Sequence, residues 1–121
     1  MATLGNNVFD KGLSYLSTNG TRLDICSSEP ATYAAVSGVS LGNKTDLSIS
    51  SPGDRTGGGR KVTVAKITDG SVTATGTATH YAITNGSNEL LATGSLADSQ
   101  AVTSGNTFTL ASFDIGIPAP A

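Results

Sequence analysis

The C-terminal half of the chain, from Gly59 to Pro118, most constrains the fold, because short runs of Val, Thr, Ile, Phe and Tyr alternate there with turn-forming pairs. Asp-Gly, Asn-Gly and Ser-Gly pairs between β-branched runs are typical of consecutive antiparallel strands. The expected strands span residues 61–67, 72–84, 89–96 and 107–117, with turns at 69–70, 85–88 and 104–106 and a loop at 97–100. The sequence therefore predicts a mainly all-β fold.

Two details of these strands favour a closed or layered sheet over a flat one. The last strand carries two apolar sets of opposite parity, Phe108 and Leu110, then Phe113, Ile115 and Ile117. A strict period of two cannot bury both sets on one side, so either a bulge near residues 111–112 resets the register or the strand crosses between layers. Gly76 in an expected strand marks a bulge or a close backbone approach. We therefore expect an antiparallel β-sandwich or a barrel-like module.

The N-terminal segment, residues 1–20, follows a different pattern, with apolar residues at spacings of one, four and three: Val8, Phe9, Leu13 and Leu16. This spacing places them on one face of a helix, which we expect over residues 7–17. A helix this short is marginal by itself, so its apolar face must dock on something.

The sequence between the helix and the C-terminal half is less regular. Residues 21–26 read as a strand that a Glu-Pro pair ends, and residues 31–59 predict little beyond a short strand near Leu47 and Ile49. A chain of 121 residues favours one domain. We divide it into a helical arm (1–20), a β module (21–118) and a tail (119–121).

The composition indicates a thin core, since the chain holds 15 Gly, 15 Ser and 17 Thr and only 37% hydrophobic residues. Burial yields roughly 25 cal/mol per Å² and must offset about 1.5 kcal/mol of ordering entropy per residue. Such a chain gains from neighbours, so we expect a homo-oligomer or a larger assembly.

Charge and hydropathy argue against two classes of partner. Only 13% of residues are charged, the net charge is −2, and no basic run suits nucleic acid. No stretch of 18 apolar residues predicts a membrane span. The start, MATLGNNVFDKG, lacks the basic and apolar parts of a secretion signal, so we expect synthesis in the cytoplasm.

No residue pattern predicts catalysis, a metal site or a cofactor. His80 is the one histidine, so a hydrolase would have to use it, and no Gly-x-Ser-x-Gly elbow accompanies it. The glycines at 57–59 precede Arg60, Lys61 and an expected strand, whereas a phosphate-binding loop needs a helix there. The carboxylates are scattered, without a calcium-loop spacing. We expect a protein that is not an enzyme.

The C-terminal half resembles short structural proteins of tailed bacteriophages and prophages. The resemblance lies in an ATHYAI strand, a turn, LLATGSL, then VTSGNTFTL and a closing DIGIP, and it extends to NNVFDKGLSYL and LGNKT near the N-terminus. It covers most of the chain and carries no catalytic motif. It implies a virion component made in the cytoplasm of a bacterial host.

The resemblance leaves the place in the particle open. A capsid decoration protein that binds the major capsid protein is the first hypothesis, and a tail or fibre-associated protein or a carbohydrate-binding surface module are the alternatives. A trimer is suggested by the symmetry of capsids, not by any residue. The expected assembly contacts lie in segment 1–20 and in loop 50–60: Val8, Phe9, Leu13, Leu16, Arg55 and Arg60.

Cys26 is the one cysteine, so no disulfide can form within the chain. It is either a small residue on the less apolar side of a strand or half of a disulfide between subunits, which an odd cysteine in a particle outside the cell can form.

Overall fold

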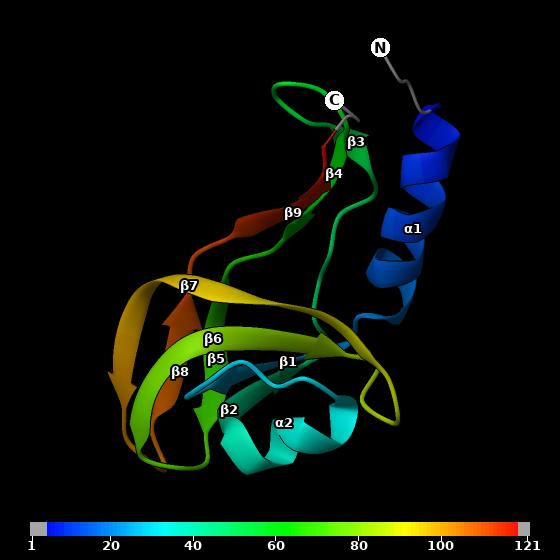
Figure 1. Cartoon of the computed structure of the whole chain (residues 1–121). Coiled ribbons are helices and arrows are strands. Elements are labelled where there is room, and N and C mark those ends of the chain that lie inside the picture. The colour runs from blue at the N-terminus through cyan, green and yellow to red at the C-terminus, as the bar shows by residue number, and fades with distance from the viewer. Residues whose placement is uncertain (1–4, 119–121) are drawn as a thin grey trace.

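The structure, a computed structural model, describes residues 5–118 as a curled antiparallel sheet, a smaller second sheet and two helices (Figure 1). The mainly β fold with a short N-terminal helix is confirmed. The elements follow the chain as α1 (Asn6–Asn19), β1 (Arg22–Cys26), α2 (Tyr33–Val39), β2 (Ser40–Thr45), β3 (Gly53–Asp54), β4 (Arg60–Val64), β5 (Ile67–Val72), β6 (Gly76–Thr84), β7 (Leu90–Val102), β8 (Thr107–Leu110) and β9 (Phe113–Ile117).

Strand β1 lies at the centre of the larger sheet, whose order is β7-β6-β1-β2-β5-β8. Leu23 and Ile25 point into the main hydrophobic core. Asp24 and Cys26 point to the opposite face, which α2 covers. Both faces of β1 are therefore buried.

The larger sheet curls into a half-barrel that does not close with a strand ladder within the described residues (Figure 1). Its two edge strands, β7 and β8, approach each other, and the side-chain amide of Gln100 donates to the carbonyl of Thr109 at 3.0 Å. A side chain thus bridges the seam where a further strand pair would close a full barrel.

The second sheet has the order β3-β4-β9. The expected strand 107–117 is divided at 111–112, because β8 pairs with β5 and β9 pairs with β4. The apolar change of parity thus marks a crossing between sheets. We call α1, β3, β4 and β9 the arm, and the six-stranded sheet with α2 the body.

Helix α1 confirms the expected helix and extends it at both ends. Phe9, Leu13 and Leu16 are buried, and the N–H of Gly20 closes the helix by donating to the carbonyl of Leu16 at 2.7 Å. Leu13 and Leu16 belong to the same core cluster as Leu23 and Val62. The apolar face of α1 therefore docks within its own chain, and arm and body share one core.

Several expected boundaries were wrong. Asp69 and Gly70 do not turn the chain but lie inside β5, residues 97–100 continue β7, and residues 73–75 interrupt the expected strand 72–84. Helix α2 and strand β2 fill the segment for which the sequence predicted little, and Ile49 makes one isolated bridge to Val64. Gly76 begins β6, and a Cβ there would lie 3.1 Å from the Leu41 side chain, so a side chain and not another backbone segment lies close to it.

Candidate functional site

An exposed apolar stripe runs along the arm. Within residues 5–118 the large hydrophobic side chains that are exposed are Val8 (60%), Tyr15 (52%) and Ile117 (37%), and all three belong to α1 or β9. Val8, Gly12 and Tyr15 follow spacings of four and three, so they share one helix face. A Cβ on Gly12 would lie 3.8 Å from Cδ1 of Ile117, so β9 borders that face. We call Val8, Gly12, Tyr15 and Ile117 the arm stripe.

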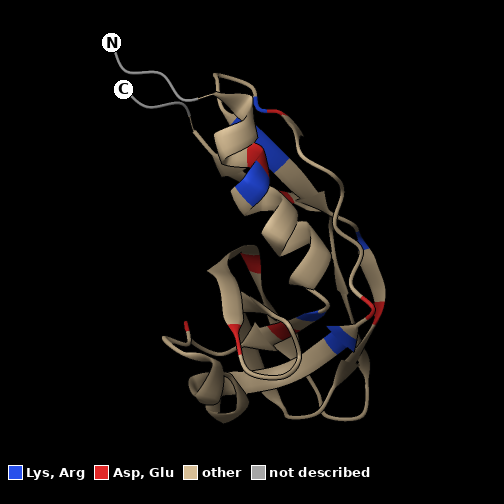
Figure 2. Ribbon diagram, turned by 90° about the vertical axis from the view of Figure 1, so that its right-hand side faces the viewer, with Lys and Arg blue, Asp and Glu red and all other residues tan. Residues whose placement is uncertain are grey.

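Figure 2 shows Lys, Arg, Asp and Glu positions along the ribbon. Most charged residues of the arm form ion pairs with one another. Arg60 reaches from β4 to Asp10 of α1 at 2.9 Å and also to Asp54. Hydrogen bonds to Asp10, and then to Asp54, raise the pKa of the Arg60 guanidinium. These ion pairs tie α1 to the second sheet, so the arm offers little unpaired charge to a partner.

A second cluster of charges joins β4 to β9. Lys61 Nζ lies 2.8 Å from one oxygen of Asp114, and the Thr63 hydroxyl donates to the other at 2.7 Å. Hydrogen bonds from Lys61 and Thr63 hold the pKa of Asp114 below its usual value. The strand that carries Ile117 is thereby held on β4.

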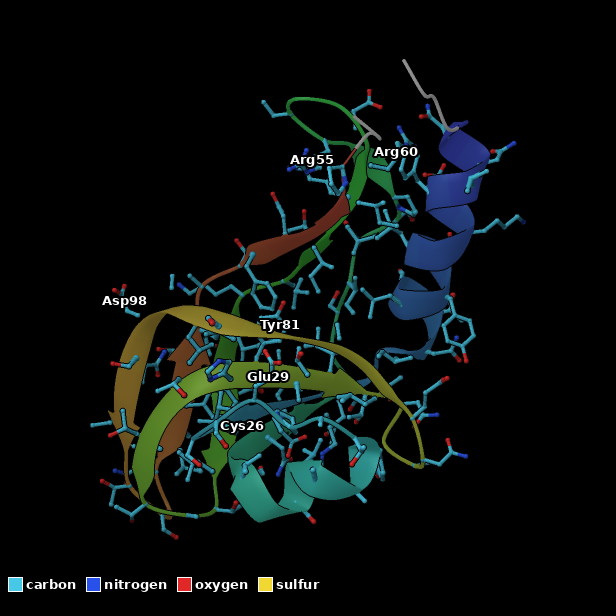
Figure 3. All side chains as sticks on the ribbon, in the orientation of Figure 1. Cys26, Glu29, Arg55, Arg60, Tyr81 and Asp98 are labelled. Atoms are coloured by element: carbon cyan, nitrogen blue, oxygen red, sulfur yellow. The ribbon has the colours of Figure 1, made fainter. Side chains whose placement is uncertain are left out.

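The expected contact residues fall into two groups. Val8 is exposed on the arm stripe, whereas Phe9, Leu13 and Leu16 are buried within the chain, where no partner reaches them without unfolding α1. Arg55 and Arg60 lie near the tip of the β3–β4 hairpin and are half-buried (Figure 3). Arg55 Nη1 donates to the carbonyl of Gly58, one of three successive glycines with positive φ.

Sequence reasoning did not place Tyr15 or Ile117 among the expected assembly contacts. The seven-residue separation of Val8 and Tyr15 was a usable signal, because it puts both side chains on one face of the helix. Ile117 could not be found that way, since only the pairing of β9 with β4 brings it beside α1.

Cys26 is enclosed, with no exposed surface, between Val36 of α2 and Ala82 of β6. Burial, and then the nearby Asp24, raise the pKa of its thiol to about 12. An interchain disulfide stays a prediction, and it would require α2 to move away. The buried-residue interpretation explains the position without such a movement.

His80 lies beside hydroxyl groups. Nδ1 is 2.9 Å from the Thr79 hydroxyl and Nε2 is 3.4 Å from the Ser95 hydroxyl. In a catalytic triad a carboxylate orients the ring of the base, and within residues 5–118 the hydrogen bonds of His80 include no carboxylate. These two hydroxyl groups lie within hydrogen-bonding distance of both ring nitrogens, as is common for a half-exposed histidine on a strand.

A carbohydrate-binding module would need exposed aromatic rings, and the tyrosines of the chain are Tyr15, Tyr33 and Tyr81. Tyr81 packs on Phe113 with ring centroids 4.6 Å apart. Burial raises the pKa of its hydroxyl. Tyr81 thus joins the body to β9, and it also lines a second cavity of about 370 Å³ beside Phe113.

Residues 5–118 contain no group of three His, Cys, Asp or Glu side chains that could hold a metal ion. Within the same residues, both helices are too short or too polar to cross a membrane. Comparison with protein-family models, curated proteins and solved structures found no match to this chain.

Proposed function

We propose that this chain is a structural protein of a tailed-phage virion, and first of all a capsid decoration protein that binds the assembled shell without catalysis. The observation that carries the proposal is the arm stripe, on which Val8 and Tyr15 of α1 and Ile117 of β9 are exposed. The resemblance of the ATHYAI and VTSGNTFTL segments to phage structural proteins supplies the class of partner.

The stripe suits a contact that is repeated many times. Burying one aliphatic side chain contributes roughly 1.5–3 kcal/mol, so one stripe gives a modest affinity. Most of the arm's charges are already paired, which limits the cost of removing water from them. A protein that binds the assembled shell, and not its separate subunits, stabilises the shell by mass action.

The test is binding of purified variants to particles that lack the protein, measured by co-sedimentation. Val8→Asp should weaken binding at least about tenfold, because it would bury an unpaired charge at the contact. An acidic residue in the first turn of a helix is compatible with helix formation, so the melting temperature should stay the same. Thr109→Asp on β8, far from the stripe, is the matched control and should bind normally.

Equal binding of Val8→Asp and the unchanged protein, with both folded, would rule out the stripe as the contact. Copy number then separates the two structural roles. Hundreds of copies per particle support a capsid or tail-tube position, whereas six or twelve copies support a connector or a fibre.

Light scattering of the free protein tests the proposed homo-oligomer and its proposed trimeric state.

A further inference from the structure

A second feature lies at the other end of the molecule, where β1 carries an ion pair toward α2. Arg22 Nε lies 2.9 Å from Oδ1 of Asp24, and Arg22 Nη2 lies 3.2 Å from Oδ2. The Ser40 hydroxyl donates to Oδ2 at 2.7 Å. Only 1% of Asp24 is exposed, so a fully buried carboxylate is held in a fixed orientation.

This pair lines a cavity of about 420 Å³ between the sheet and α2. Small-molecule sites span roughly 300–1,000 Å³. Strands supply the floor and α2 supplies one wall, while Val36 of α2 packs on Cys26 and Ala82. We call this cavity the polar pocket, and its lining residues are Arg22, Asp24, Tyr33, Ala34, Val36, Ser37, Ser40, Asn43, Thr73 and Thr84.

A contribution to stability is a weak explanation for the Arg22–Asp24 ion pair. Replacing a buried ion pair by apolar residues of similar volume is often neutral or stabilising. The Arg22 side chain, 39% exposed, borders open space, whereas the Asp24 carboxylate lies behind it and is held by Arg22 and Ser40. Asn43 and Tyr33 line the same space, and within residues 5–118 neither the Asn43 amide nor the Tyr33 hydroxyl has a hydrogen-bond partner.

The charges of the pocket select against ions. Arg22 and Asp24 lie 2.9 Å apart and neutralise each other, so neither an anion nor a cation meets a net opposite charge there. A ligand hydroxyl can accept from Arg22 or from the Asn43 amide and donate to the Asn43 amide oxygen. The Tyr33 ring adds an apolar surface at the wall. A neutral molecule with several adjacent hydroxyls satisfies all of these groups together.

We therefore propose that the polar pocket binds a neutral sugar of one or two rings. The site is distinct from Tyr81 and from the arm stripe, so it does not depend on the structural role proposed above. The sugar enters between α2 and β1, donates one hydroxyl to the amide oxygen of Asn43, and accepts hydrogen bonds from Arg22 and from the Asn43 amide.

The test is a titration of the isotopically labelled full chain, followed by amide chemical shifts. The probes are glucose, galactose, mannose and maltose, with acetate and methylammonium as charged comparisons. At least one sugar should cause saturable shifts confined to the pocket lining. Asn43→Ala should weaken that binding about tenfold, through loss of a hydrogen bond that leaves a polar ligand group unpaired.

Tyr33→Phe is the second variant, with an expected loss of a few fold. Asn7→Ala and Tyr15→Phe, both on exposed positions of α1, are the matched controls and should bind as the unchanged protein does. The absence of saturable shifts with all four sugars overturns the proposal. So do pocket shifts caused by acetate or methylammonium alone, or equal affinities of Asn43→Ala and Asn7→Ala.

Discussion

At the scale of single residues, Gly42 is the position where the larger sheet tolerates a side chain least. It lies in β2 between Ile25 of β1 and Val72 of β5. A Cβ there would lie 2.4 Å from the carbonyl oxygen of Ser71 and 3.0 Å from Cα of Val72. These are backbone atoms, so no side-chain rotation relieves the clash.

Gly42→Ala should therefore lower the free energy of unfolding by about 3 kcal/mol, as overpacked interior sites do. Urea denaturation at 25 °C measures this as a lower midpoint with an unchanged slope. Gly38→Ala in α2 is the control, because its Cβ would have nothing within 4 Å. It should be neutral or stabilise by up to about 1 kcal/mol. Equal stability of the two variants would contradict the sheet packing described above.

Cys26 gives a residue-scale prediction that depends on pH. Its thiol has an ordinary pKa of 9.0, and burial raises this to about 12 in the folded chain. Above about pH 9 the unfolded chain loses the proton while the folded chain keeps it, so the unfolded state binds fewer protons and stability falls as pH rises. The stability associated with the protonated Cys26 thiol is fully present below pH 9 and is lost progressively between pH 9 and about pH 12.

Denaturant midpoints at pH 8, 9, 10 and 11 measure this loss, and Cys26→Ala should show a smaller decline. Maleimide labelling at pH 8 should also be at least about a hundredfold slower in the folded protein than in urea, because a buried neutral thiol is inert. Rapid labelling of the folded protein would show that α2 opens readily, and it would favour the interchain disulfide.

At the scale of elements, the docking of α1 decides whether the arm is a folded unit. Leu13 is 3% exposed and packs in the shared core. Leu13→Ala should cost about 2–5 kcal/mol, the range for large apolar residues truncated in a core. Lys11→Ala, on the exposed side of the same helix, should change stability by less than about 0.5 kcal/mol. Thermal and urea unfolding of both variants measure the difference, and similar values would show that α1 is not docked.

The same helix shows what could be predicted from the sequence. Its apolar spacing predicted the element and, except for Val8, its inward face, and the change of parity between Leu110 and Phe113 predicted either a bulge or the observed crossing between sheets. Both are periodic signals over several residues. What the helix packs against was not predictable, because the partners Leu23 and Val62 come from distant strands.

Local signals failed where tertiary contacts override them. The pair Asp69-Gly70 is typical of a hairpin turn. In the structure, however, a Cβ on Gly70 would lie only 2.2 Å from the ring of Phe108. Glycine is needed there for close packing, not for a turn. Helix α2 has only seven residues and one buried side chain, Val36. Its sequence therefore shows no hydrophobic periodicity from which a helix could be predicted. The polar pocket that it covers was therefore missed as well.

At the scale of the whole molecule, the two proposed contact surfaces lie at opposite ends. The arm stripe lies on α1 and β9, at the end where the β3–β4 hairpin projects, and α2 lies at the far end of the body (Figures 1 and 2). If the arm binds the particle, α2 and the polar pocket face away from it. A decoration protein of this shape would hold its shell with one end and offer a small-molecule site at the other.

This orientation can be measured with cysteine variants, because native Cys26 is buried and gives little background labelling. Val8→Cys lies on the arm stripe, and Gly38→Cys lies on the exposed side of α2, where a side chain meets no other atom. On assembled particles, maleimide should label Gly38→Cys as fast as in the free protein. Val8→Cys should be labelled at least about tenfold more slowly on particles, because the contact excludes solvent. Protection of Gly38→Cys with free access to Val8→Cys would reverse the proposed orientation, and equal rates at both sites would place neither end at the contact.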